Sequence, residues 1–390
     1  MRGSAVIAGA ALLGLVRLAH AEPPELHVYN WSDYIAPDTV ANFEKETGIT
    51  VTYDVYDGNE VLEAKLLAGH SGFDIVVPSA SPFMAREIAA GAFRGLDKAR
   101  LPNLKNLDPA MLALAAEADP GNAHGVPYLW SVTGIGYNVT MVERALGAGV
   151  PRDSLALLFD PAHAARLAPC GIELLDTPQE VIPAALAYQG VDPTSRDPGD
   201  LDRAVALLDR LRPYVRRFHS SQYINDLAAG DVCIALGYSG DVIQARDRAR
   251  EAESGAEIAF RVPREGAQMS IDMLGIPVDA PHPDNAHRFI DYLLRPEVIA
   301  AITNTVSYPN PNLAATPFVK PQIRRPGDLS ARCGAPAVLH RPPGAARLRA
   351  GPDARLEPDE IGLLSGDGAP RNHRRKQRLR VNASGRPGVA

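Results

Sequence analysis

Apolar and polar segments between residues 26 and 78 follow one another in a pattern that predicts strands and helices in alternation. The predicted strands are residues 26–29, 49–55 and 73–78, and the predicted helices are residues 37–47 and 60–68. Pro37 begins the first helix, and Gly48 and Gly69 end the two helices. The third strand is a continuous apolar run, as in a parallel sheet covered on both faces. The pattern therefore predicts an α/β fold with a doubly wound sheet.

Aromatic and polar residues stand directly after two of these strands. Trp31-Ser32-Asp33-Tyr34 follows the first strand, and Ser79 follows the third. Sheets of this kind bind ligands beyond the carboxyl ends of their strands. Two rings, a hydroxyl and a carboxylate on one turn suit a flexible organic cation, which needs π faces and anionic oxygens. The alternative interpretation is that Trp31 and Tyr34 are core aromatics and that Asp33 is a helix N-cap.

The first 21 residues have the layout of a secretory signal peptide. An early Arg2 precedes an apolar run at residues 5–16, which is too short to span a bilayer, and Ala19-His20-Ala21 is a small-x-small cleavage site. No later segment resembles a membrane span. We therefore expect a soluble mature chain in the periplasm.

Two of the three cysteines are placed for a disulfide. Cys170 and Cys233 each lie beside a predicted strand, at residues 171–175 and 232–236. A bridge between them would close a loop of roughly 60 residues and contribute about 4 kcal/mol on the chain-entropy account, and it would fit an oxidising compartment. The alternative is a pair of buried free thiols. Cys333 is unpaired in either case.

The net charge conceals an asymmetry along the chain. Residues from Pro321 onward carry a balance of +8, whereas the preceding part carries −14. An acidic body favours encounters with small cations and argues against nucleic acid as a partner. The basic residues 371–380 lack interleaved aromatic residues, so a solvated run is the expectation there.

Several long strings resemble the periplasmic polyamine-binding proteins of ABC importers, most closely the putrescine-binding type. They are LHVYNWSDYIAPDTVANFEKETGITVTYDVYDGNEVLEAKLLAG, FDIVVPSAS, TGIGYNV, FHSSQYINDLAAGDVCIALGYSGD and YLLRPEVIA. The resemblance extends from about Leu26 to about Phe318. It implies a two-lobed type II periplasmic solute-binding fold, with discontinuous lobes joined by hinge strands and a ligand held in the cleft between them.

The resemblance also implies the limits of the lobes. The first lobe would comprise residues 26–130 and 256–294, and the second would comprise residues 134–250 and 296–319. Hinge strands would then lie near residues 131–133 and 251–255. Closure around a ligand would be a hinge motion that contacts with both lobes stabilise.

The ligand-binding residues follow from the resemblance position by position. They are Trp31, Ser32, Asp33, Tyr34, Ser79, Glu180, Ser220, Tyr238, Asp241, Ser270, Asp272 and Tyr308. We expect Asp241 and Asp272 at one ammonium group of a diamine, Asp33 and Glu180 toward the other, and Trp31, Tyr34 and Tyr308 along the alkyl chain. Local interpretations remain open. Asp241 could cap a helix at residues 242–250, Glu180 could occupy a first helical turn, and Ser79 or Ser220 could be turn hydroxyls.

The chain departs from the family at two positions of this site and in its last segment. Ser270 stands where the family usually has an aromatic residue, and Tyr238 where it often has tryptophan. Loss of a ring at Ser270 could admit a longer or bulkier amine. From Lys320 to Ala390 there is no Phe, Trp or Tyr and the composition turns to Arg, Pro, Gly and Ala. We expect this tail to be disordered and the second lobe to be incomplete, and we interpret the tail as GC-rich DNA translated in a shifted frame.

The sequence thus predicts a monomeric, extracytoplasmic subunit that captures a putrescine-like polyamine and delivers it to an ABC permease complex in the inner membrane. No cofactor or metal is expected, since the ten histidines are scattered. A polyamine sensor subunit would use the same site. His219 beside Ser220 and Ser221 raises the further alternative of a secreted hydrolase, but the chain has no nucleophile elbow, His-Glu-x-x-His motif or phosphate-binding loop.

Overall fold

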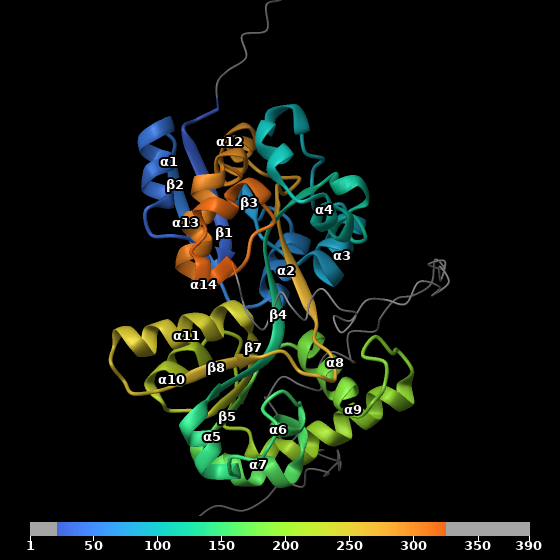
Figure 1. Cartoon of the computed structure of the whole chain (residues 1–390). Coiled ribbons are helices and arrows are strands. Elements are labelled where there is room, and N and C mark those ends of the chain that lie inside the picture. The colour runs from blue at the N-terminus through green and yellow to red at the C-terminus, as the bar shows by residue number, and fades with distance from the viewer. Residues whose placement is uncertain (1–21, 325–390) are drawn as a thin grey trace, which may run out of the picture. The chain divides into compact units, whose positions relative to one another are not determined.

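A mixed sheet of nine strands extends through residues 22–324, the part of the chain that the computed structural model describes (Figure 1). The strand order is β2-β1-β3-β9-β4-β7-β5-β6, and β8 pairs with β4. The strands are β1 (Glu25–Trp31), β2 (Thr50–Tyr56), β3 (Ile75–Val76), β4 (Gly125–Asn138), β5 (Ile172–Leu174), β6 (Arg217–Phe218), β7 (Ile234–Tyr238), β8 (Ile258–Arg261) and β9 (Met269–Gly275). The predicted signal peptide, Cys333 and the tail from residue 325 lie outside the described residues.

Helices cover this sheet on both halves of the described chain. In the first half they are α1 (Thr39–Thr47), α2 (Asn59–Ala68), α3 (Ala85–Ala89) and α4 (Pro109–Ala115). The middle of the chain forms α5 (Val139–Leu146), α6 (Ala156–Phe159), α7 (Pro161–Leu167), α8 (Pro178–Tyr188), α9 (Pro198–Leu211), α10 (Tyr223–Ala229) and α11 (Ser239–Glu251). The last described part forms α12 (Pro283–Leu293), α13 (Pro296–Val306), a 3-10 segment (Leu313–Phe318) and α14 (Pro321–Arg324).

The long strand β4 belongs to both lobes. Its residues 125–132 pair with β9, beside which β3, β1 and β2 continue the first sheet. Its residues 133–138 pair with β7 and β8, and β5 and β6 follow β7 in the second sheet. Two sets of buried side chains correspond to these sheets, one around β1 and α12 and the other around β5, β7 and α8. The predicted crossing at residues 131–133 is therefore the point where β4 changes sheet.

The local elements of the first lobe follow the sequence pattern closely. Gly48 ends α1 with φ of 73°, a left-handed conformation that glycine adopts without the steric cost of a Cβ. Strand β1 pairs in parallel with both β2 and β3, as the doubly wound pattern predicts. Strand β3 is shorter than predicted, with two paired residues. The neighbouring β9 is antiparallel to it, so the first sheet is mixed rather than wholly parallel.

The prediction that residues 296–319 resume the second lobe is wrong. Ile299, Ile302 and Val306 of α13 are buried in the same cluster as Leu26 and Val28 of β1. Figure 1 shows α13 and α14 in orange beside the blue α1 and β1. The physical reason is that α13 presents an apolar face to α12, which already covers β1, so the chain gains more burial in the first lobe than by crossing again.

The second predicted crossing is also displaced. Residues 251–255 form the end of α11 and a turn at Gly255, where φ is 75°. Strand β8 then pairs with β4 in the second sheet, from Ile258 opposite Asn138 to Arg261 opposite Ile135. The return to the first lobe therefore comes after β8, between residues 262 and 269, because β8 completes its hydrogen bonds with the second sheet first.

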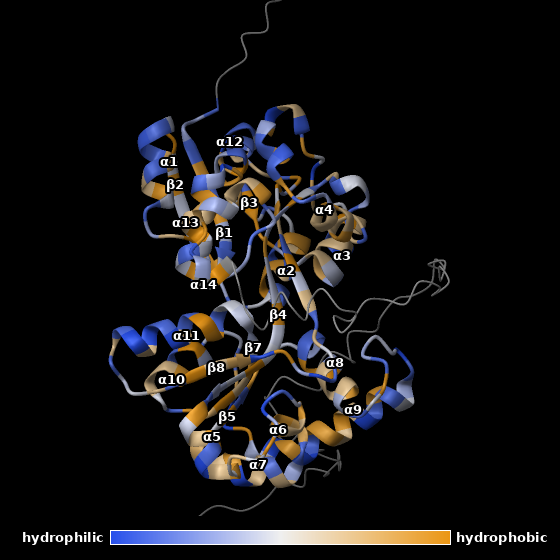
Figure 2. Ribbon diagram, in the orientation of Figure 1, coloured by the Kyte–Doolittle hydropathy of each residue, from blue (hydrophilic) through white to orange (hydrophobic). Residues whose placement is uncertain are grey.

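Hydrophobic and hydrophilic residues occupy different parts of the fold. Figure 2 shows hydrophobic residues on the strands and on α13, and hydrophilic residues on the outer turns of α1, α11 and α12. Within the part of the chain that is described, no helix is long and apolar enough to cross a membrane.

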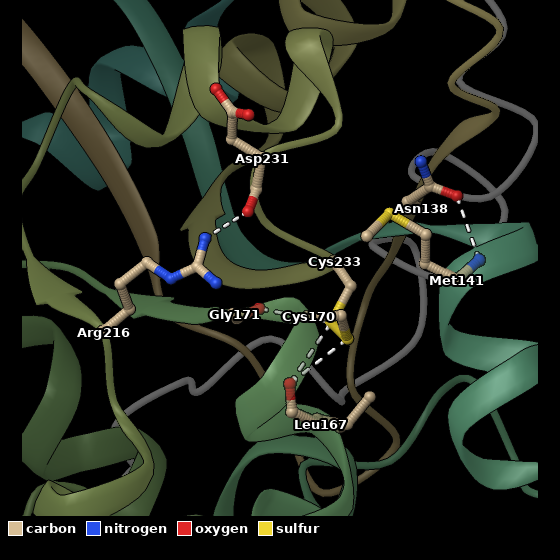
Figure 3. Close-up of a disulfide and its surroundings, with 8 residues drawn as sticks. All are labelled: Asn138, Met141, Leu167, Cys170, Gly171, Arg216, Asp231 and Cys233. Atoms are coloured by element: carbon tan, nitrogen blue, oxygen red, sulfur yellow. Dashed lines mark hydrogen bonds between the residues drawn. A yellow bond between two sulfur atoms is a disulfide. The ribbon is translucent and has the colours of Figure 1, made fainter.

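The predicted disulfide between Cys170 and Cys233 is present (Figure 3). Their Cα atoms are 5.4 Å apart, and 63 positions separate them in sequence. Cys170 precedes β5 and Cys233 precedes β7, and these strands are parallel neighbours with Ile172 opposite Ile234. The bridge therefore joins the starts of two adjacent strands in the second lobe.

Glu87 in α3 is a buried carboxyl in the first lobe, with 0% exposure and no hydrogen-bond partner for its two oxygens among the described residues. Burial, followed by the charge of Glu63, raises its pKa to about 8. Because the unfolded chain ionises this group near pH 4.5 and the folded chain does not, the stability falls by about 1.4 kcal/mol per pH unit between these values.

We expect Glu87→Gln to remove this loss. The free energy of unfolding of the variant, relative to that of the native protein, should rise by roughly 2 to 4 kcal/mol from pH 5 to pH 8. Urea unfolding at both pH values measures it. Glu25→Gln, at an exposed position of β1, is the control. An equal stability difference between native protein and Glu87→Gln at both pH values would contradict the assignment of a neutral Glu87.

Candidate functional site

A cavity that is open to solvent on one side lies at the carboxyl ends of β1, β2, β3 and β7, against the crossing strands β4 and β9. It is lined by Trp31, Ser32, Tyr34, Tyr56, Asp57, Ser79, Ser131, Ser220, Ser221, Ile224, Tyr238, Asp241, Ser270, Asp272 and Tyr308. Ten of the twelve residues that the sequence predicts are among them. Asp33 and Glu180 are not. The carboxyl ends of the strands are where sheets of this kind place ligands.

Asp272 on β9 is one of two buried carboxyls in the wall of this cavity. It is 6% exposed, and its oxygens accept hydrogen bonds from the Tyr34 hydroxyl at 2.6 Å and from the Ser79 hydroxyl at 2.7 Å. Burial raises its pKa to about 6, although both hydroxyl donors favour the ionised form. Ser79 is thus more than a turn hydroxyl, since it orients this carboxyl.

Asp241 is the second buried carboxyl and comes from the first turn of α11. Its oxygens accept from the hydroxyls of Tyr223 and Tyr308, both at 2.7 Å. Burial raises its pKa to about 6 against the effect of these two donors. The side chain does not cap α11, because it makes no capping hydrogen bond and the N-cap position belongs to Tyr238. The structure therefore turns Asp241 toward the cavity rather than toward its own helix.

The two carboxyls have different hydroxyl donors, which are Tyr34 and Ser79 for Asp272 and Tyr223 and Tyr308 for Asp241. No ion pair of Asp241 or Asp272 with Lys, Arg or His occurs within residues 22–324. Each therefore offers an anionic oxygen pair that hydroxyl groups hold in place and that a cation could neutralise.

Aromatic rings form the apolar walls between these groups. The rings of Tyr34 and Tyr308 meet edge to face with centroids 4.7 Å apart, and those of Trp31 and Tyr56 are also 4.7 Å apart. The Trp31 indole N–H donates to the carbonyl of Val77 at 2.8 Å, which fixes the ring. Such faces suit methylene groups and cations.

Gly240 allows Tyr308 to reach Asp241. A Cβ on Gly240 would lie 2.0 Å from Cδ2 of Tyr308, a distance that no side chain can occupy. Glycine at position 240 therefore has a steric reason, because the absence of a side chain leaves room for the ring of Tyr308. The hydroxyl of that ring orients the Asp241 carboxyl.

Asp33 lies outside the lining of the cavity. Its backbone is left-handed, with φ of 54°, and its half-exposed carboxylate forms an ion pair with Arg248 of α11 at 2.9 Å. It is no helix cap either, because Asp38 occupies the N-cap position of α1. Asp33 thus connects a turn of the first lobe to a helix of the second.

Glu180 lies behind the cavity wall in the first turn of α8. It accepts hydrogen bonds from Thr133 at 2.6 Å, Gln268 at 3.0 Å and Ser270 at 3.2 Å. Burial raises its pKa to about 7. Glu180 lines a second, smaller pocket and not the main cavity. It is connected to the main cavity by its hydrogen bond from Ser270, which lines that cavity.

Ser220, Ser270 and Tyr238 also line the cavity. The Ser220 hydroxyl accepts a hydrogen bond from the backbone N–H of Asp176 at 3.2 Å, as a turn hydroxyl would. Ser270 is the cross-strand partner of Ser131, and the two form a hydroxyl-bearing floor. The ring of Tyr238 ends β7 at the wall.

Sequence reasoning missed five lining residues, namely Tyr56, Asp57, Ser131, Ser221 and Ile224. Tyr56 and Asp57 stand at the carboxyl end of β2, so the rule that identified Trp31 would have found them. Ser131 could be found only from its pairing with Ser270, which depends on the register of β4 and β9. Tyr223, which orients Asp241, was also missed because its ring lies in the core.

The chemistry of this arrangement is that of binding. Two buried carboxyls, several hydroxyls and five aromatic rings can hold a cation with an apolar stem. In the described part of the chain, no group of three or more His, Cys, Asp or Glu side chains is arranged to hold a metal ion.

Comparison with known proteins agrees with this description. The chain is similar to the putrescine-binding periplasmic protein PotF of Escherichia coli K12, with 52% identity over 336 residues that cover 84% of this chain and 90% of that protein. It is 51% identical over 304 residues to the putrescine-binding periplasmic protein SpuD of Pseudomonas aeruginosa UCBPP-PA14, covering 78% and 83%. Among solved structures, the substrate-binding protein PotD of a Streptococcus pneumoniae spermidine/putrescine ABC transporter has a TM-score of 0.62 and 27% identity, over 77% of this chain and 87% of that one.

These similarities confirm the predicted fold class, a periplasmic solute-binding fold of α/β type. The relatives named here are binding proteins. Residues 38–327 match the family described as bacterial extracellular solute-binding protein, and the chain belongs to that family.

Proposed function

We propose that the protein captures a linear polyamine of the putrescine type in the main cavity. The observation that carries this proposal is the pair of buried carboxyls, Asp241 and Asp272, each held by two hydroxyl donors. The printed names of the two sequence relatives, both putrescine-binding, support the same ligand class. A diamine carries two cations and an apolar stem, which is the chemical complement of this cavity.

One ammonium group would contact Asp272 and the other Asp241. This differs from the expectation that both serve one end, because Asp272 lies on β9 of the first lobe and Asp241 on α11 of the second. Asp33 is paired with Arg248, and Glu180 already accepts three hydrogen bonds. The rings of Tyr34, Tyr308 and Trp31 would contact the methylene groups.

The magnitudes are sufficient for useful binding. Burial of four methylenes contributes roughly 3 kcal/mol, and a cation over a ring roughly 0.5 to 2 kcal/mol. An ammonium and a carboxylate in contact gain about 4 kcal/mol at an effective dielectric of 20, before desolvation is subtracted. Micromolar affinity needs about −8 kcal/mol, so two ion pairs and two rings are enough.

A thermal-shift and calorimetric panel tests the proposal. Putrescine, cadaverine, agmatine and spermidine should raise the melting temperature of the purified protein, because they bind only the folded form. 1,4-Butanediol has the same four-carbon stem without charge and should produce no shift. Absence of a response to every amine, or an equal response to the diol, would refute a cation site.

Binding should weaken in acid. Asp241 and Asp272 both have a pKa of about 6, so they are ionised at pH 7.5 and protonated at pH 5, whereas the amine stays charged throughout. If both carboxylates must be ionised, the putrescine Kd should rise about 100-fold between pH 7.5 and pH 5. Calorimetry across this range measures it. A Kd that is constant to within threefold would exclude these carboxyls as the anionic groups.

We further propose that the protein acts outside the cytoplasm as a monomer and delivers the amine to an ABC permease in the inner membrane. The disulfide supports this location, since such bridges persist in oxidising compartments. Deletion of the gene should abolish uptake of labelled putrescine at micromolar concentration. Unchanged uptake with an altered transcriptional response to putrescine would favour a sensor subunit instead.

A further inference from the structure

His219 lies between the edge strand β6 and helix α10, next to two serines of the cavity. Its Nδ1 accepts hydrogen bonds from the backbone N–H groups of Ser221 and Gln222, both at 3.1 Å. Ser221 and Gln222 are the last two residues before α10, and Gln222 is its N-cap residue. The imidazole therefore satisfies two backbone donors in the turn that leads into α10.

The turn that His219 closes delivers several groups to the cavity. Ser220, Ser221 and Ile224 line it. Tyr223 follows directly and donates its hydroxyl to Asp241 at 2.7 Å, while the same hydroxyl accepts from the backbone N–H of Tyr238 at 2.9 Å. The geometry of this turn thus sets both a wall of the cavity and the orientation of one of its carboxyls.

The backbone on the other side of His219 is fixed independently. Its N–H donates to the carbonyl of Leu174 at 2.9 Å, which continues the pairing of β6 with β5. His219 therefore joins the edge of the second sheet, through its backbone, to the turn before α10, through its imidazole. A hydrolytic role does not fit this geometry, because Nδ1 faces two backbone donors and lies 3.5 Å from the Ser221 hydroxyl.

We propose that His219 is a positioning residue for ligand binding, which holds the turn before α10 through the two hydrogen bonds that Nδ1 accepts, so that Ser220, Ser221 and Tyr223 present the second lobe's half of the site. The binding measurements that test this role rest on the proposed polyamine function, whereas the hydrogen-exchange measurement does not.

Substitutions that keep or remove the acceptor test the proposal. In His219→Asn the amide oxygen can take the place of Nδ1, whereas in His219→Gln the polar group lies one bond farther and in His219→Leu it is absent. By calorimetry at pH 7.5 we expect the putrescine Kd of His219→Asn within threefold of native, and that of His219→Leu raised at least tenfold. His163→Leu in α7 is the matched control, since Nδ1 of His163 lies 3.0 Å from the carbonyl oxygen of Ala156 and the residue does not line the main cavity.

A ligand-independent readout separates this proposal from the polyamine function. Amide hydrogen exchange of residues 220–223 should be at least tenfold faster in His219→Leu than in native protein and nearly unchanged in His219→Asn. If no amine binds but exchange responds in this way, the polyamine function fails and the positioning role stands. If His219→Leu does not fold, an affinity at least fivefold weaker in His219→Gln than in His219→Asn supports the proposal.

Equal Kd values and equal exchange rates in native protein and His219→Leu, or a loss in His219→Asn as large as in His219→Leu, would overturn the proposal.

Discussion

Asp272→Asn is expected to weaken putrescine binding by about 100-fold or more. Removal of one partner from a desolvated pair of opposite charges costs about 2 to 5 kcal/mol, and each 1.4 kcal/mol is a factor of ten. The substitution keeps the shape of the side chain but places an amide N–H₂ where one of the hydroxyls of Tyr34 and Ser79 now donates. Calorimetry at pH 7.5 measures the Kd, and the amine-induced thermal shift should nearly vanish.

The variant should fold, which makes its loss of binding interpretable. Because the pKa of Asp272 is about 6, ionisation of this group at pH 7.5 works against folding in the absence of a cation, and an uncharged side chain removes that cost. Glu173→Gln is a matched control, since Glu173 is a buried carboxyl of β5 that does not line the cavity. An Asp272→Asn protein that binds putrescine as tightly as Glu173→Gln would show that the site is elsewhere.

Loss of the disulfide should destabilise the protein by about 4 kcal/mol. On the chain-entropy account, a bridge across 63 positions removes that much conformational freedom from the unfolded chain. The bridge joins the starts of β5 and β7, which lie in the core of the second lobe (Figure 3). Urea unfolding of the double variant Cys170→Ser with Cys233→Ser, compared with native protein under non-reducing conditions, measures the loss.

Cys333→Ser controls for the removal of a thiol as such. Binding of putrescine by the double variant below its unfolding transition should remain within a few fold of native, because neither cysteine lines the cavity. A loss of stability below 1 kcal/mol in the double variant would mean that the unfolded chain is restricted by other means.

Much of the site could be predicted from the sequence because it stands at strand ends. Trp31, Ser32 and Tyr34 follow β1 and Ser79 follows β3, and each of these residues lines the cavity. The resemblance to a known family supplied Tyr238, Asp241, Asp272 and Tyr308. Local pattern alone left open that Asp241 caps a helix, because aspartate is a preferred N-cap residue.

Two acids that the same reasoning brought to the site lie outside the lining of the main cavity. Asp33 pairs with Arg248, 215 positions later, and Glu180 accepts from Thr133, Gln268 and Ser270. No local signal distinguishes a carboxylate that faces a cavity from one that faces a distant donor. The roles of the twelve residues in ligand binding stay predictions until the variants are measured.

The sequence by itself determined the alternation of strands and helices in the first lobe, the disulfide pair and the strand ends that carry the site. The elements depend on residues close together in the chain, whose periodicity and turn chemistry can be interpreted one segment at a time, and the disulfide followed from two cysteines that each lie beside a predicted strand. Only the tertiary structure decided that α13 packs on the first lobe, that the chain returns after β8, and that Tyr223 and His219 hold Asp241 and its wall in place. Those outcomes depend on which apolar faces and which donors meet in the folded chain, and competition among such partners is settled by packing in three dimensions.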